Sequence, residues 1–202
     1  MILDFEPLKP AQIYHAMTQV LIPRPIAWVL SENEDNSHNL APFSYFSGVC
    51  SQPPLISLSI GHKKDGQPKD TRRNILERKK FIIHIPSLEQ AQEVTDSAKD
   101  LDYQSSELDL LNLETLTPPG FSLPILKDSK IALECEYFEM FELGEVKQAL
   151  IIGRIKKLYA SDNCIIQEND RTEFSAKTIN PLSRLGGKDY AGLNSNFSIQ
   201  PS

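Results

Sequence analysis

The alternation of apolar and polar positions divides the first third of the chain into one helix and three strands. Apolar residues recur at helical spacing from Lys9 to Val20, which predicts a short helix. Pro23 and Pro25 then impose an extended backbone. Strands are predicted over residues 26–30, 40–49 and 55–60, with a polar hairpin turn over residues 31–39. The third strand alternates apolar and hydroxyl residues, which indicates that one of its faces lies in the core.

Helical patterns are concentrated in the middle of the chain. Asp70 is expected to cap a helix that runs from Thr71 to about Lys79. A capping box, Ser87 to Gln90, opens a second helix that continues through Ala98. A further helical turn or two is expected over residues 105–111.

The remaining pattern is again that of strands. They are predicted over residues 81–85, 131–137 and 149–159. The alternation slips after Tyr137, which suggests a bulge or turn, and Gly153 is expected to mark a bend. Residues 171–193 show no regular pattern and are expected to be irregular.

These elements predict a mainly β fold in one domain that spans residues 1–202. No repeat, low-complexity tract or linker divides the chain. One helical excursion, from Asp70 to about Leu111, breaks a series of strands of similar length, which differs from the regular rhythm of a doubly wound sheet. A closed or partly closed barrel with peripheral helices fits this order better.

Composition narrows the setting in which the protein works. The 202 residues carry a net charge of −6, which argues against a general nucleic-acid binder or a surface drawn to anionic lipid. No signal peptide is visible, and no apolar stretch approaches the ~20 residues that span a bilayer. The three cysteines are far apart and form no CxxC pair, so reduced thiols and a cytoplasmic location are expected.

Several common chemistries have no support in the sequence. Neither a GxGxxG nor a P-loop motif is present, and no GxSxG nucleophile elbow exists. The four histidines lack the spacing of metal ligands. His84 lies inside a predicted strand and is expected to be a core or lining residue rather than a base. We therefore predict no metal site.

The sharpest local anomaly is the segment from Gly61 to Arg73. Its five Lys and Arg residues against two Asp give +3 in thirteen residues of an acidic chain. The segment ends at a predicted helix N-terminus, where main-chain N–H groups and the helix dipole favour an anion. It is either a phosphate site or a solvated basic turn.

Two further segments carry polar groups in unusual surroundings. Asn39 to Val49 places amide and hydroxyl groups among apolar residues, so it could present donors to a flat polar ring or be a plain core strand. Arg184 to Tyr190 joins paired glycines to cationic and aromatic side chains, so it is either part of a ligand lid or a tight surface turn.

Together these segments resemble the flavin reductase-like family, which includes flavoredoxins and ferric reductases. The matching pieces, in order, are Pro23-Arg-Pro-Ile-Ala27, Asn39-Leu-Ala-Pro-Phe-Ser44, Pro53-Pro-Leu55, Lys69-Asp-Thr-x-x-Asn-Ile75 and Arg184-Leu-Gly-Gly-x-x-Tyr190. The resemblance spans nearly the whole chain. It implies a Greek-key split β-barrel, a homodimer and an FMN at the subunit interface.

The resemblance also implies a set of cofactor-binding residues. They are Arg24, Asn39, Ala41, Pro42, Phe43, Ser44, Ser59, Lys64, Lys69, Asp70, Thr71, Asn74, Arg184, Gly186 and Tyr190. The expected activity is transfer of hydride or electrons from NAD(P)H through FMN to a small-molecule or protein acceptor. Because the flavin would carry the chemistry, no catalytic side chain is expected. The alternatives are a non-catalytic, flavoredoxin-like FMN carrier and a split barrel that binds another anionic metabolite.

Overall fold

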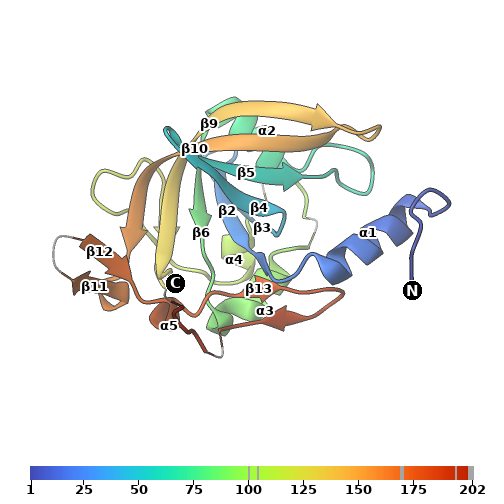
Figure 1. Cartoon of the computed structure of the whole chain (residues 1–202). Coiled ribbons are helices and arrows are strands. Elements are labelled where there is room, and N and C mark those ends of the chain that lie inside the picture. The colour runs from blue at the N-terminus through green and yellow to red at the C-terminus, as the bar shows by residue number, and fades with distance from the viewer. Residues whose placement is uncertain (100, 104, 169–170, 194, 200–202) are drawn as a thin grey trace.

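One seven-stranded antiparallel sheet organises the chain and curls until its two edges meet (Figure 1). The structure is a computed structural model that describes residues 1–99, 101–103, 105–168, 171–193 and 195–199. Across the sheet the strands are β3 (His38–Phe43), β2 (Ala27–Glu32), β6 (Lys80–His84), β9 (Ile131–Leu143), β10 (Gln148–Ala160), β5 (Pro54–Ile60) and β4 (Phe46–Ser51). The edge strands β3 and β4 are joined by only Ser44 and Tyr45, so the sheet must close into a barrel.

Strand β2 is buried on both faces, and this divides the core in two. Trp28 and Leu30 pack outside the barrel against Val94 and Leu108, which come from the helical segment between β6 and β9. Ala27 and Val29 face the barrel interior with residues from β5, β6 and β10. Burial on both sides explains why this strand is a continuous apolar run rather than an alternating one.

The expected bulge after Tyr137 is present. Tyr137 pairs with Gly153 and Glu139 pairs with Ile152, which leaves Phe138 as an extra residue in β9. A Cβ on Gly153 would lie 2.6 Å from the Phe81 ring, so this position accommodates only glycine without a shift of the core. The bulge lies where both long strands turn from the barrel into the upper hairpin (Figure 1).

Helices and short strands surround the barrel. The helices are α1 (Pro10–Val20), α2 (Asp70–Arg78), η1 (Leu88–Gln90), α3 (Ala91–Asp96), α4 (Glu107–Leu110), η2 (Asp162–Cys164) and α5 (Ala176–Ile179). The short strands are β1 (Arg24–Pro25), β7 (Thr115–Leu116), β8 (Ile125–Leu126), β11 (Ile165–Glu168), β12 (Arg171–Phe174), β13 (Ser183–Arg184) and β14 (Tyr190–Ala191). Pairing of β1 with β13 brings the C-terminal segment beside the start of the barrel. No helix in the described ranges has the length and apolarity to cross a bilayer.

Three sequence-based boundaries need correction. The single strand expected over residues 40–49 is two strands, because the chain crosses between the sheet edges at Ser44 and Tyr45. The helix expected from Ser87 to Ala98 is a 3-10 turn followed by α3, although its capping box is present. Residue Asp70 does not cap α2: Lys69 holds the N-cap position and Asp70 is the first helical residue.

The C-terminal segment is also more regular than expected. Residues 171–193 contain three short strands and α5, and each strand pairs over only two to four residues. Such short pairings give little periodicity, so the sequence pattern could not reveal them. The central helical excursion includes positions 100 and 104, which lie outside the described residues.

Candidate functional site

The basic segment folds as a hairpin that leads into α2. His62 bridges to Pro68, and the Lys63 N–H donates to the Gln67 carbonyl at 2.8 Å. Gly66 occupies the turn with a φ of +83°, a conformation that glycine adopts readily. The hairpin places the ammonium group of Lys63 2.8 Å from Asp70, beside the first turn of the helix.

Helix α2 begins without a side-chain cap. Lys69 occupies the N-cap position, and a lysine side chain has no acceptor atom for the N–H groups of the first turn. These N–H groups and the helix dipole create positive potential, which the nearby lysines increase. The residues at this helix start therefore favour an external anion.

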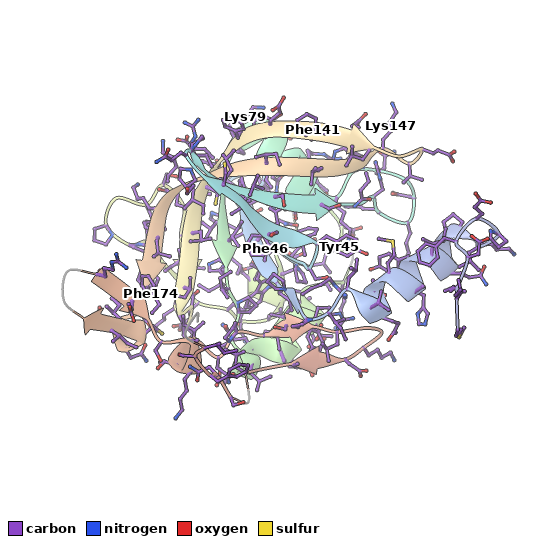
Figure 2. The ribbon with its side chains drawn as sticks, viewed as in Figure 1. Tyr45, Phe46, Lys79, Phe141, Lys147 and Phe174 are labelled. Atoms are coloured by element: carbon purple, nitrogen blue, oxygen red, sulfur yellow. The ribbon has the colours of Figure 1, made fainter. Side chains whose placement is uncertain are left out.

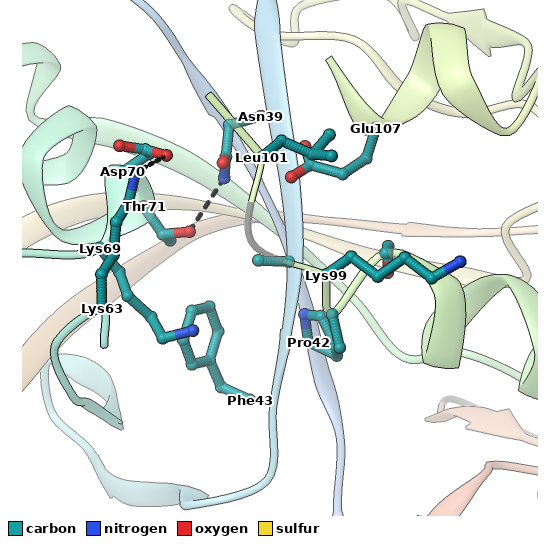
Figure 3. A pocket seen from close by; sticks show the side chains of 13 residues that line it. Asn39, Pro42, Phe43, Lys63, Lys69, Asp70, Thr71, Lys99, Leu101 and Glu107 are labelled. Atoms are coloured by element: carbon teal, nitrogen blue, oxygen red, sulfur yellow. Dashed lines mark hydrogen bonds and ion pairs between the residues drawn. The ribbon is translucent and has the colours of Figure 1, made fainter. Parts of the chain in front are cut away.

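Thr71 and Asn39 connect α2 to the edge strand β3. The Thr71 side chain is almost fully buried, and its Oγ1 accepts a hydrogen bond from the Asn39 amide at 2.9 Å. Because this oxygen already accepts from Asn39, the hydroxyl proton of Thr71 can be donated to a ligand. Figure 3 shows this bond at the wall of a small hollow.

This cationic hollow has a cavity volume of about 60 Å³. Its lining residues are Asn39, Ala41, Pro42, Phe43, Lys63, Lys69, Asp70, Thr71, Ser97, Ala98, Lys99, Leu101 and Glu107. Glu107 is the deeply buried acid among them, with 5% of its surface exposed. Its Oε2 accepts the Leu40 N–H at 2.8 Å, and burial raises the pKa of its carboxyl group to about 7.

A second and larger hollow lies next to the first. It has a volume of about 420 Å³ and is lined by Tyr14, Pro42, Phe43, Ser44, Tyr45, Ser59, Gly61, Lys69 and Gln148. Three residues, Pro42, Phe43 and Lys69, line both hollows, so the two are adjacent. We call this second space the strand-crossover hollow, because Ser44 and Tyr45 form its centre. Figure 2 labels Tyr45 at the front of this crossover.

Polar groups in the strand-crossover hollow are held in place by their neighbours. Gln148 donates to the Ser59 hydroxyl at 3.0 Å. The Tyr45 hydroxyl is buried, and among the described residues it has no hydrogen-bond partner. Burial, and then the neighbouring Tyr14, raise the pKa of Tyr45. The wall thus combines aromatic surface with hydroxyl and amide groups, as small-molecule sites do.

A third hollow, of about 280 Å³, continues from the crossover toward the C-terminal segment. Tyr14 and Ser44 line both spaces, and Arg24, Arg184 and Gly187 line the third. The register of β1 against β13 pairs Arg24 directly with Arg184.

Arg24 is a structural hub rather than a side chain with its donors open. Its guanidinium donates to the carbonyls of Thr18, Leu21 and Leu185 and to the hydroxyl of Ser44. These bonds join the end of α1, the crossover and the C-terminal segment. The residue therefore positions the walls of the second and third hollows.

Most of the residues implied by the family resemblance meet in this chain of hollows. Those that line one of the three hollows are Arg24, Asn39, Ala41, Pro42, Phe43, Ser44, Ser59, Lys69, Asp70, Thr71 and Arg184. Lys69 of the basic segment and Ser44 of the crossover share one wall, although 25 positions separate them in the sequence.

Four of the implied residues lie elsewhere. Lys64 is exposed on the hairpin, and Asn74 is buried, donating to Ser31 and Asn33. Gly186 packs against the side chain of Gln19. The Tyr190 hydroxyl accepts a hydrogen bond from Thr95. None of these four residues lines any of the three hollows described above.

The structure adds lining residues that sequence reasoning missed. They are Tyr14, Tyr45, Lys63, Lys99, Glu107 and Gln148. Lys63 lies in the basic segment that the sequence singled out, but its neighbour Lys64 was chosen there instead. Glu107 gave no signal, because its position next to β3 depends on tertiary packing of a four-residue helix.

A closed antiparallel barrel with its ligand hollows at the strand crossover defines the class of split-barrel proteins. The chain belongs to the family described as flavin reductase like domain, which it matches over residues 17–170. It is 31% identical to an uncharacterized protein of Halalkalibacterium halodurans, over 98% of this chain and 94% of that one.

Two solved structures extend the comparison. Nitrilotriacetate monooxygenase component B from Bacillus cereus is 30% identical, with a TM-score of 0.89 over 98% of both chains. A candidate flavin reductase with a split barrel domain from Shewanella frigidimarina is 17% identical, with a TM-score of 0.85 over the full length of both. This second likeness bears on the fold alone, and the predicted split barrel is confirmed. The family supports a flavin as the cofactor.

Proposed function

We propose that this protein is an FMN-binding oxidoreductase that passes hydride or electrons from NAD(P)H to a separate acceptor. The observation that carries the proposal is the position of Lys69. It holds the N-cap position of α2 without a side-chain hydrogen bond to the first turn, and it lines both the cationic hollow and the strand-crossover hollow. A ligand with a phosphate at one end and a polar ring at the other would fit, with the phosphate in the cationic hollow and the ring in the strand-crossover hollow.

The residues present fit such a ligand. In the cationic hollow, the Thr71 hydroxyl, the α2 N–H groups and two lysines would hold the phosphate. In the strand-crossover hollow, Ser44 and Tyr45 would offer hydrogen bonds, and Phe43 would exclude water. The Tyr45 hydroxyl has no hydrogen-bond partner among the residues that the structure describes. The cationic hollow is the smaller of the two, which is the order expected for a phosphate site beside a ring site.

Bound FMN would supply the redox chemistry, so the protein's part is to bind, orient and tune it. No buried side chain of the described site is needed as a general base. The third hollow, beside Arg184, leaves room for a second reactant at the same end as the crossover. The similarity to a monooxygenase component supports delivery of electrons to a separate acceptor.

A second copy of the chain would complete the site. Helix α1 projects from the barrel (Figure 1), and Val20 at its end is 72% exposed. Tyr14 of the same helix lines the strand-crossover hollow, so a partner that packs on α1 would also cover the flavin. Three unpaired cysteines support a reducing, cytoplasmic setting.

The test is an absorbance spectrum of the purified protein after addition of FMN, followed by anaerobic NADH or NADPH. A flavin spectrum and steady NAD(P)H oxidation with excess free flavin are expected. A yellow protein without turnover would instead indicate a flavoredoxin-like carrier. A protein that takes up no FMN would contradict the proposal and favour another anionic metabolite.

A further inference from the structure

Glu107 is a buried acid in a place where an ionised carboxylate is unfavourable. It lines the cationic hollow, and 5% of its surface is exposed. Among the described residues, no lysine or arginine lies within ion-pair distance of its carboxyl group. A buried acid without such a partner tends to keep its proton.

The charged groups around Glu107 come from three elements. From the hairpin and α2 come Lys63, Lys69 and Asp70, of which Lys63 and Asp70 pair with one another at 2.8 Å. From the segment after α3 comes Lys99. From β3, the main-chain N–H of Leu40 donates a hydrogen bond to the carboxyl group.

These surroundings raise the share of the neutral acid near pH 7. Burial raises the pKa of Glu107 to about 7, the Leu40 N–H opposes this rise, Asp70 adds to it, and Lys63 opposes it. On its own short helix, Asp109 is exposed and does not line the hollow. A phosphate entering the hollow would add negative charge and hold the proton more firmly.

We propose that Glu107 binds the flavin phosphate as a neutral carboxylic acid, which donates its O–H to a phosphate oxygen. This inference rests on the proposed function and adds a ligand-recognising residue to it. The ionised form would face the phosphate as a like charge, so phosphate affinity should fall as the carboxyl group loses its proton. The affinity for a flavin without a phosphate should not depend on whether the Glu107 carboxyl group is ionised.

The experiment compares FMN and riboflavin binding by flavin fluorescence, each at about pH 7 and about pH 9. The second pKa of a phosphate monoester is about 6, so FMN is mainly a dianion at both values. For the unmodified protein, FMN affinity should weaken roughly tenfold over this range, whereas riboflavin affinity should change little. Glu107→Gln keeps a carbonyl oxygen for the Leu40 N–H but cannot ionise. Its FMN affinity should stay near the low-pH value of the unmodified protein at both pH values.

Asp109→Asn is the matched control, because it removes one charge from the same helix outside the hollow. It should retain the pH dependence of the unmodified protein. An equal pH dependence in Glu107→Gln, or FMN affinity that does not change with pH in the unmodified protein, would overturn the inference. The second result needs no variant, so a folding defect cannot obscure it.

Lys69→Ala separates this inference from the proposed function. If Lys69→Ala lowers FMN affinity relative to riboflavin but Glu107→Gln behaves like the unmodified protein, the phosphate site stands and the role of Glu107 fails. If Lys69→Ala leaves the preference for FMN over riboflavin unchanged, the phosphate site itself is wrong.

Discussion

A lysine at the start of α2 costs helix stability, and this cost points to a ligand. Cations are unfavourable near a helix N-terminus, and lysine cannot accept the N–H groups that serine or aspartate would satisfy. Lys69 nevertheless occupies the N-cap, with Lys63 close to the same turn. An anion bound at this point would accept hydrogen bonds from the N–H groups of the first turn and would be attracted by the lysines, so both features would then be favourable.

The hydroxyl of Thr71 offers a selective test of phosphate binding. Thr71→Val keeps the shape of the side chain but removes the donor, so FMN affinity should fall by about 1–3 kcal/mol, the cost of a lost charge-assisted hydrogen bond. Thr71→Ser retains the hydroxyl and serves as the control. Calorimetric titration with FMN and riboflavin measures the effect. Equal losses for both flavins would contradict a phosphate contact.

His84 shows the opposite case, a polar residue with a purely structural role. As expected from the sequence, it is a core residue, 1% exposed. Its Nε2 accepts the Leu126 N–H at 3.0 Å, so the neutral ring donates from Nδ1 to the Trp28 carbonyl. Burial lowers its pKa to about 4.

This buried imidazole should make stability fall in acid. Its pKa is lower in the folded than in the unfolded protein, so the unfolded chain takes up the proton first as pH drops. The contribution is complete above about pH 6.5 and is lost toward about pH 4, with an upper limit near 3 kcal/mol. Urea unfolding at several pH values measures this. In His84→Gln, which does not titrate, the decline over this range should be smaller, and an identical decline would contradict the assignment.

Bulges in β9 and β10 allow each of these two long strands to belong to the barrel along one part of its length and to the outer hairpin along the other. The register shifts at Gly153 and again beyond Ile155. Each shift adds a bend and local twist, which redirects the strand pair. The end of this hairpin carries Gln148, whose amide fixes the Ser59 hydroxyl in the strand-crossover hollow.

Gly153→Ala should therefore destabilise the protein although it adds only one methyl group. The new Cβ would lie 2.6 Å from Phe81 and 3.1 Å from Ile56, both in the barrel core. Overpacking of this kind costs about 1–3 kcal/mol. Gly48→Ala is the control, since its Cβ would meet nothing within 4 Å. Thermal unfolding of both variants checks the difference, and equal melting temperatures would contradict it.

Local patterns predicted the strands better than their ends. The alternation in β5 and the slip at Tyr137 depend on neighbours in sequence, and both were confirmed. The break at Ser44 and Tyr45 depends on barrel closure, which brings together edges that the sequence pattern does not relate. The spacing of apolar residues indicates which face of one strand is buried, but it carries no information on how two sheet edges come together.

The same limit applies to the site. Lys69 and Thr71 were found because helix-start chemistry is local, and Asn39 because its motif resembled a family. Glu107 and Gln148 reach the hollows from distant segments, so tertiary packing alone brings them there. Asn74 matched the family motif, but its side chain turns to Ser31 and Asn33, a direction that the helical spacing did not settle.

For the whole molecule, the outer face of the barrel near the strand-crossover hollow carries partly exposed apolar side chains. The register places Phe141, Leu150 and Ser59 side by side across β9, β10 and β5. Two positions along, Ile152 lies between Ser57 and the acidic Glu139. Phe141 is 45% exposed and lies on the upper strands in Figure 2. Apolar and hydroxyl side chains on one sheet face are typical of a surface that a partner covers.

If a second copy covers this face, a single charge on it should separate the subunits. Leu150→Asp would place an unpaired carboxylate inside the interface, and a desolvated charge of this kind costs several kcal/mol. Sedimentation velocity should then show dimers for the unmodified protein and monomers for the variant, with FMN affinity reduced because the covered hollow becomes open. Ile166→Asp is the control, since Ile166 is also exposed and apolar but lies on the separate β11–β12 hairpin. A dimer that survives Leu150→Asp would show that the interface lies elsewhere. If the unmodified protein sediments as a monomer, no second copy covers α1 or this face, and the proposed dimer is wrong.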